Sequence, residues 1–220
     1  MLLNALVELM DIYTQLNNFF LKHKKTSLII KIILVLLLVK IFVFRILPYK
    51  DLSQFKKQNY SIQFYDRNEN LLYVSSLEEG KRREFISLKE VPDFLVQSFL
   101  ASEDKRFYFH NGIDYLSIFR ALIQNISSNK NVSGASTITM QLARMVSPSE
   151  KRNFLAKIKD VYNAYRIESK LSKKKILELY LNSIPFGNNV EGISSAARFY
   201  FGKEVKDLIP EVALCLSVFP

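Results

Sequence analysis

The stretch EDKRFYFHNGID, residues 103–114, begins with two acids and two bases, followed by three aromatic residues and a histidine. Leu95, Phe99 and Glu103 are spaced by four residues, so a helix would place this acid on an otherwise apolar face. A carboxylate in such surroundings is a competent proton acceptor near neutral pH. Asp104 points about 100° away and must serve another purpose. Helix geometry fits equally well a structural ion pair between Glu103 and a buried Arg or Lys.

A second polar segment, SGASTITMQLAR (residues 133–144), is typical of a loop that enters a helix. We expect Ser136 to be the N-cap residue of that helix. Thr137 and Gln141 are four residues apart and share a face, and Arg144 lies one turn beyond Gln141. Because a helix N-terminus with free N–H groups attracts phosphate oxygens, the segment is a candidate phosphate site. The alternative is an ordinary capped helix with a polar face.

A third segment, residues 152–182, has the pattern of two consecutive amphipathic helices. Arg152, Ala156 and Asp160 fall on one stripe at spacings of four. A base and an acid there either face a common cleft or form a solvated edge. We expect a neighbouring apolar stripe to face the core, formed by Phe154, Leu155, Ile158, Val161, Tyr162 and Tyr165.

The elements that position these segments are mainly helical. Residues 61–76 alternate around a polar turn and predict a short β hairpin. Helices are expected near residues 91–106, 115–128, 136–147, 152–171, 172–182, 190–201 and 210–219. The predicted fold is therefore mainly α.

Residues 28–47 contain 17 apolar residues out of 20, enough for one transmembrane helix. The sequence thus divides into an N-terminal cytoplasmic or interfacial segment (1–27), this helix, a linker with the hairpin (48–86) and a helical domain (87–220). Basic residues flank the apolar run on both sides, so their distribution does not decide its orientation.

The chain of 220 residues has a net charge of +10, which suits an anionic partner: nucleic acid, a lipid surface or a phosphorylated substrate. The basic residues are not interleaved with aromatic residues on one stripe, which argues against nucleic acid. Cys215 is the only cysteine, which excludes an intramolecular disulfide, and its apolar surroundings predict a core residue.

Together, the three segments resemble the peptidoglycan glycosyltransferases, the lysozyme-like domains of monofunctional transglycosylases and class A penicillin-binding proteins. The resemblance rests on several motifs in order: ED-x-x-F-x-x-H-x-G from Glu103, G-x-S-T-x-x-x-Q from Gly134, KKILELYLN (174–182) and EGISSAARFYFGKEVKDLIPEVAL (191–214). MQLAR and PFGNNVEG resemble most the C-type branch of these penicillin-binding proteins.

The resemblance implies a membrane enzyme that polymerises lipid II at the outer face of the bacterial cytoplasmic membrane and releases undecaprenyl pyrophosphate. Glu103 matches the general base for the acceptor's 4-hydroxyl, and Asp160 matches the second catalytic acid. The remaining matches concern the substrate site. Asp104, Phe107 and His110 match residues that shape the site around Glu103, Ser136, Thr137 and Gln141 match the donor cleft, and Arg144 and Arg152 match cations at the pyrophosphate.

The resemblance also implies the growing glycan strand as a partner and leaves other cell-wall synthesis proteins open. No cofactor is required, although a divalent cation, Mg or Mn, remains open at Asp160. The pattern departs from the family where Arg-Lys-x-x-Glu is usual, because this chain has Ala156-Lys157-x-x-Asp160. A displacement of about 1 Å at a catalytic group can cost on the order of a hundredfold in rate.

The sequence stops at Pro220, before the last glycosyltransferase motif of the family. We therefore expect a fragment or a shortened form, with apolar surface exposed where a final helix would pack. Two other functions stay open. One is an inactive relative that binds lipid II as a membrane-bound scaffold, and the other is a lysozyme-like enzyme that cleaves glycan with Glu103 as the acid. The second has no need of Arg144 or Arg152.

Overall fold

The computed structural model describes residues 28, 30–32, 34–35, 59–78, 80–128, 136–149 and 153–219. The chain divides into two units, Met1–Pro48 and Tyr49–Pro220. Among the described residues, no helix is long and apolar enough to cross a membrane. The predicted segment 1–27 and most of the predicted transmembrane helix 28–47 lie outside the described residues. The fold described below is that of the second unit.

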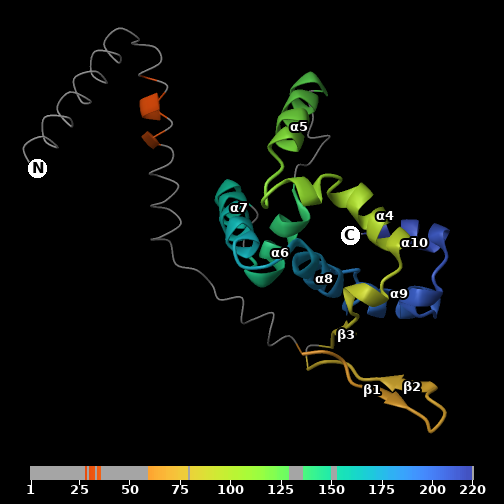
Figure 1. Cartoon of the computed structure of the whole chain (residues 1–220). Coiled ribbons are helices and arrows are strands. Elements are labelled where there is room, and N and C mark those ends of the chain that lie inside the picture. Colours follow the sequence, from red (N-terminus) through yellow and green to blue (C-terminus); the bar gives the residue numbers. More distant parts are fainter. Residues whose placement is uncertain are drawn as a thin grey trace, which may run out of the picture. The chain divides into compact units, whose positions relative to one another are not determined.

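The second unit is mainly helical, as predicted. Its α-helices are α4 (Asp93–Glu103), α5 (Tyr115–Ser128), α6 (Ile138–Val146), α7 (Phe154–Glu168), α8 (Lys173–Ser183), α9 (Ile193–Phe201) and α10 (Pro210–Val218). Short 3₁₀ turns join them, η1 (Leu88–Glu90), η2 (Phe107–Phe109) and η3 (Val205–Asp207). In Figure 1, α5 extends away from the other helices of this unit.

The predicted hairpin is present as the antiparallel strands β1 (Gln63–Tyr65) and β2 (Leu71–Val74). Asp66 closes its turn, because one carboxylate oxygen accepts from the backbone N–H groups of Asn68 and Asn70, each at 2.8 Å.

A second, parallel pair joins β3 (Arg82–Arg83) to β4 (Val190–Glu191). The buried Glu84 accepts from Nε of Arg198 on α9 at 3.0 Å, and Arg83 is paired with Glu191. These ion pairs fasten the segment that follows the hairpin to the helical body.

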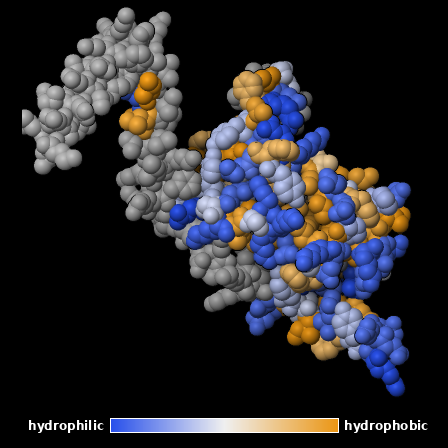
Figure 2. Space-filling model, viewed as in Figure 1, coloured by the Kyte–Doolittle hydropathy of each residue, from blue (hydrophilic) through white to orange (hydrophobic). Residues whose placement is uncertain are grey.

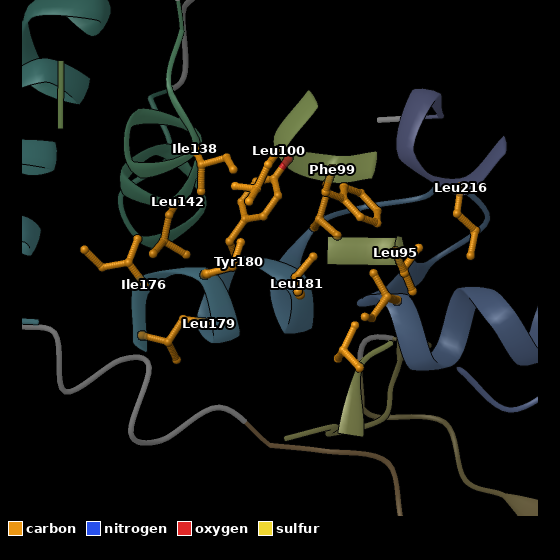
Figure 3. Close-up of a cluster of buried hydrophobic side chains, with 14 of the residues drawn as sticks. Leu95, Phe99, Leu100, Ile138, Leu142, Ile176, Leu179, Tyr180, Leu181 and Leu216 are labelled. Atoms are coloured by element: carbon orange, nitrogen blue, oxygen red, sulfur yellow. The ribbon is translucent and has the colours of Figure 1, made fainter. Parts of the chain in front are cut away.

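Helix α8 runs through the centre of the core. Ile176, Leu177, Tyr180 and Leu181 are at most 1% exposed. Figure 3 shows residues of α8 packed with side chains of α4, α6 and α10. Ser172 caps α8 by accepting from the N–H of Lys175, which fixes where the helix begins.

The predicted core stripe of α7 is wrong for its first half. Phe154, Leu155 and Ile158 are 76%, 71% and 48% exposed. The buried residues of α7 are instead Asp160, Ala164 and Ile167. Helix α7 packs on α6, and Asp160 of this buried stripe pairs with Arg144 of α6.

Two other expectations are corrected. The helix expected from residue 190 begins only at Ile193, because Val190 and Glu191 pair with β3 and Gly192 has a φ of 82°. Cys215 is exposed on α10 rather than buried. It lies beside Leu214 and Val218, which are 56% and 73% exposed, on the exposed side of α10.

Candidate functional site

Glu103 is the last residue of α4, and its side chain is half-buried. Its Oε2 accepts a hydrogen bond from Nε2 of Gln141 on α6 at 2.6 Å. Within the described part of the chain, no ion-pair partner of Glu103 is found. An amide donor stabilises the ionised form of a carboxylate without neutralising it, which leaves a base able to take a proton.

Asp104 turns the chain away from α4 and links two parts of the site. Its backbone leaves helical geometry at φ −159° and ψ 76°. Its buried carboxylate accepts from the N–H of Ile138, the first residue of α6, at 3.0 Å. The same carboxylate lies 2.9 and 3.1 Å from Nε2 of His110. An anion at the N-terminus of α6 also interacts favourably with the helix dipole.

Phe107 lies inside the turn between α4 and α5 and is 1% exposed. The Nζ of Lys173 lies 4.3 Å from the centre of its ring, a cation–π contact. Lys173 also pairs with Glu168 at 2.7 Å, and Glu168 accepts from the hydroxyl of Thr139 at 2.6 Å. This network could not be predicted from the sequence, because it joins three segments that only the fold brings together, around residues 107, 139 and 168–173.

The N-cap of α6 is Thr137 rather than the expected Ser136. The Thr137 hydroxyl accepts from the N–H of Met140 at 3.2 Å and donates to the carbonyl of Gly112 at 2.7 Å. Thr137 is therefore buried between two motifs, whereas Ser136 is only half-buried. Both residues fit an N-cap by type, and the contact with Gly112 decides between them.

Arg144 and Asp160 form an ion pair across α6 and α7, with Nε of Arg144 at 3.2 Å from Oδ2 of Asp160. The carboxylate is buried and the guanidinium is partly exposed. Arg152 lies outside the described residues. Among the described residues, no group of three or more His, Cys, Asp or Glu side chains is gathered that could hold a metal ion.

Helix α6 therefore joins the parts of the site: its first residue binds Asp104, Gln141 binds Glu103, and Arg144 binds Asp160. The arrangement offers a carboxylate base and, on the same helix, an arginine that can bind an anion. It suits a transfer in which a hydroxyl loses a proton and an anionic group departs.

Comparison with known proteins gives the family of this chain. The family model described as Transglycosylase matches residues 69–220. Penicillin-binding protein 1F of Bacillus subtilis is 44% identical over 140 residues, 64% of this chain and 20% of that protein. Penicillin-binding protein 1A of Neisseria lactamica is 44% identical over 140 residues, 64% of this chain and 18% of that protein.

Penicillin-binding protein 4 of Bacillus subtilis is 39% identical over 155 residues, 70% of this chain and 25% of that protein. The matched part thus spans a quarter or less of the length of these relatives. The match to the family model covers more than half of the chain and includes Glu103, Gln141, Arg144 and Asp160. The chain belongs to the transglycosylase family.

Proposed function

We propose that this chain is a peptidoglycan glycosyltransferase that polymerises lipid II, with Glu103 as the general base. The observation that carries the proposal is the bond from Gln141 to Glu103, which holds a half-buried carboxylate that has no ion-pair partner among the described residues. Glu103 takes the proton from the 4-hydroxyl of the acceptor sugar. That oxygen forms the new bond to the anomeric carbon of the donor, and the bond to undecaprenyl pyrophosphate breaks with inversion to a β-1,4 link.

Arg144 is the residue proposed to bind the departing pyrophosphate. Pyrophosphate is a weak base, so its departure needs charge neutralisation more than protonation. Nε of Arg144 donates a hydrogen bond to Asp160, and within the described residues no other group occupies the terminal nitrogens, which can bind phosphate oxygens. The role proposed for Asp160 is therefore to orient a cation. Thr137 and Asp104 place the start of the helix that carries Gln141 and Arg144.

A lipid-held substrate also suits the surface near this site. Large apolar residues are exposed in the turn that follows Glu103 and on α5, where Phe109 is 84%, Tyr115 65% and Phe119 62% exposed, and at the start of α7, where Phe154 is 76% exposed. Figure 2 shows apolar residues on the visible surface, including part of α5. Exposed apolar groups of this size fit contact with lipid. We place the protein at the bacterial cytoplasmic membrane, with the helical domain outside it and residues 28–47 as its single anchor.

The direct test is to purify the chain in detergent and to incubate it with lipid II, with Glu103→Gln as the matched variant. We expect the parent chain to form lysozyme-sensitive glycan and Glu103→Gln to form none. The variant keeps the shape and the hydrogen bond of residue 103 but cannot accept a proton.

A parent chain that binds lipid II without forming polymer would contradict the proposal and favour a lipid II-binding scaffold. Release of soluble fragments from preformed glycan, abolished in Glu103→Gln, would instead favour the lysozyme-like enzyme.

A further inference from the structure

Tyr180 on α8 is linked by two hydrogen bonds, through the side chain of Gln141, to Glu103, the proposed general base. Tyr180 is completely buried, and its ring packs edge-on against Phe99 of α4, with the ring centres 6.5 Å apart. Its hydroxyl donates to Oε1 of Gln141 at 3.2 Å, and Nε2 of the same amide donates to Glu103. Figure 3 shows the ring of Tyr180 among side chains of α4 and α6. The three residues form a chain of hydrogen bonds that ends at the carboxylate.

The chemistry of the Gln141 amide determines which group donates and which accepts in these two hydrogen bonds. A glutamine side chain presents a carbonyl acceptor on one side and an NH₂ donor on the other. If the amide of Gln141 turned over, its carbonyl would face the carboxylate of Glu103, which can only accept while it is ionised. A hydroxyl that donates to the carbonyl opposes this rotation.

The tyrosine remains a donor at physiological pH. Burial raises the pKa of Tyr180, and the negative charges of Glu103 and Asp104 raise it further. The phenol therefore keeps its proton at physiological pH. Of the two carboxylates whose charges act on Tyr180, Asp104 is paired with His110 in the turn after α4, and Glu103 accepts from Gln141. Arg144, on the same helix as Gln141, is paired with Asp160 of α7.

We propose that Tyr180 is a positioning residue for the general base: it fixes the amide of Gln141 so that its NH₂ group holds the carboxylate of Glu103. The inference rests on the proposed function only in giving Glu103 the role of base. The bond from Gln141 occupies Oε2 of Glu103. Within the described residues no hydrogen bond is made to Oε1 of Glu103, so we assign the acceptance of the proton to this oxygen.

Tyr180→Phe separates positioning from folding, because it keeps the buried ring and removes only the hydroxyl. We expect kcat to fall about tenfold, with KM changed by less than about twofold. Without the fixed donor the ionised carboxylate receives a weaker hydrogen bond from Gln141. The acid limb of the pH–rate profile should therefore move to higher pH.

Tyr200→Phe is the matched control. Tyr200 donates its hydroxyl to the carbonyl of Phe186 at 2.7 Å, in a different part of the domain. We expect its acid limb to coincide with that of the parent. Equal rate losses in both variants, with profiles of unchanged shape, would show a purely structural role and overturn the inference.

A second measurement does not need activity. The chain contains seven glutamines, so labelling them with ¹⁵N gives few side-chain NH₂ signals, and loss of a pair in Gln141→Ala assigns the one of interest. We expect Tyr180→Phe to shift the Gln141 NH₂ signals and to speed their exchange with solvent, whereas Tyr200→Phe leaves them in place. Unchanged Gln141 signals in Tyr180→Phe would overturn the inference.

The two measurements distinguish two failures. If the parent chain forms no glycan from lipid II, the proposed function fails, and the Gln141 signals alone decide whether Tyr180 holds the amide against Glu103. If the parent is active and Tyr180→Phe matches it in kcat and in pH profile, only the positioning role fails.

Discussion

The Nε of Arg144 lies 3.2 Å from Oδ2 of Asp160, which joins α6 to α7 at the candidate site. The sequence had suggested separate roles for these residues, one at the pyrophosphate and one as a catalytic acid. In the structure they form one ion pair, with the carboxylate buried and the guanidinium partly exposed. An aspartate that holds an arginine in place does not need the reach of a glutamate. The shorter side chain at position 160 is therefore compatible with the proposed reaction.

Asp160→Asn should lower kcat for glycan formation about tenfold, because Arg144 keeps its charge but loses its orientation. The free energy of unfolding should fall by only about 1 kcal/mol, since the guanidinium is partly exposed to solvent, and Tm should fall by about 2–4 °C. Steady-state kinetics with lipid II and calorimetry measure the two effects. A kcat equal to that of the parent would contradict the orienting role of Asp160.

Arg144→Ala should distinguish polymerisation from glycan cleavage. Loss of one preorganised donor to the leaving group is expected to lower kcat by about 10²–10³-fold. A lysozyme-like reaction has no pyrophosphate to stabilise and would keep its rate. The control is Lys206→Ala, which removes one positive charge from an exposed side chain in η3. If both variants polymerise lipid II equally well, Arg144 does not bind the leaving group.

Much of the domain could be predicted from the sequence because its signals are local. The spacing of Leu95, Phe99 and Glu103 predicts one face of α4, and the structure buries the first two and half-buries the third. The polar turn at Asp66 likewise predicts the hairpin.

Other features depend on contacts between distant segments. The buried stripe of α7 was missed because exposed Phe154 and Leu155 give a stronger periodic signal than Asp160 and Ala164. Thr137 and Ser136 are equivalent as caps until the carbonyl of Gly112 selects one of them. Tyr180 has the pattern of an ordinary core residue, and only the position of Gln141 gives its hydroxyl a further role.

Asp104→Asn should weaken the link between the turn after α4 and the start of α6. An asparagine cannot serve both the N–H of Ile138 and His110 in the way that the carboxylate does. We expect a loss of about 2 kcal/mol in unfolding free energy and a fall in Tm of about 4–8 °C, measured by calorimetry. The exposed Asp93 in the first turn of α4 provides the control, since Asp93→Asn should cost less than about 1 kcal/mol. Equal losses in the two variants would count against a special role for Asp104.

We expect the contribution of Asp114 to the stability of α5 to depend on pH. Burial alone would raise the pKa of Asp114, but hydrogen bonds from the N–H and hydroxyl of Ser117 and the charge of Arg106 lower it overall. A carboxyl whose pKa is lowered on folding contributes stability above its unfolded value, about 3.9, and this stability is lost as the pH falls through the folded value.

Asp114→Ala should therefore lower unfolding free energy by about 0.5–2 kcal/mol at pH 7, and the difference from the parent should shrink toward pH 3. Denaturant unfolding at both pH values measures it. A difference that is constant with pH would mean that the charge of Asp114 adds nothing to its capping role.

Substitutions at Gly192 and Gly202 can separate two reasons for a glycine, close packing and backbone conformation. Both have positive φ, 82° and 62°. A Cβ at residue 192 would lie 2.8 Å from the carbonyl oxygen of Asn182, whereas a Cβ at residue 202 has no atom within 4 Å. Asn182 cannot easily move, because its side chain bonds both the N–H and the carbonyl of Ile86, each at 2.8 Å.

We expect Gly202→Ala to lower the unfolding free energy by about 1 kcal/mol, the conformational cost alone. Gly192→Ala should cost about 3 kcal/mol, because the clash with Asn182 is added to a similar strain. The corresponding falls in Tm are about 2–4 °C and 6–12 °C. If calorimetry gives the same Tm for both variants, the backbone near Asn182 relaxes freely, and the junction between α8 and β4 is less rigid than its contacts indicate.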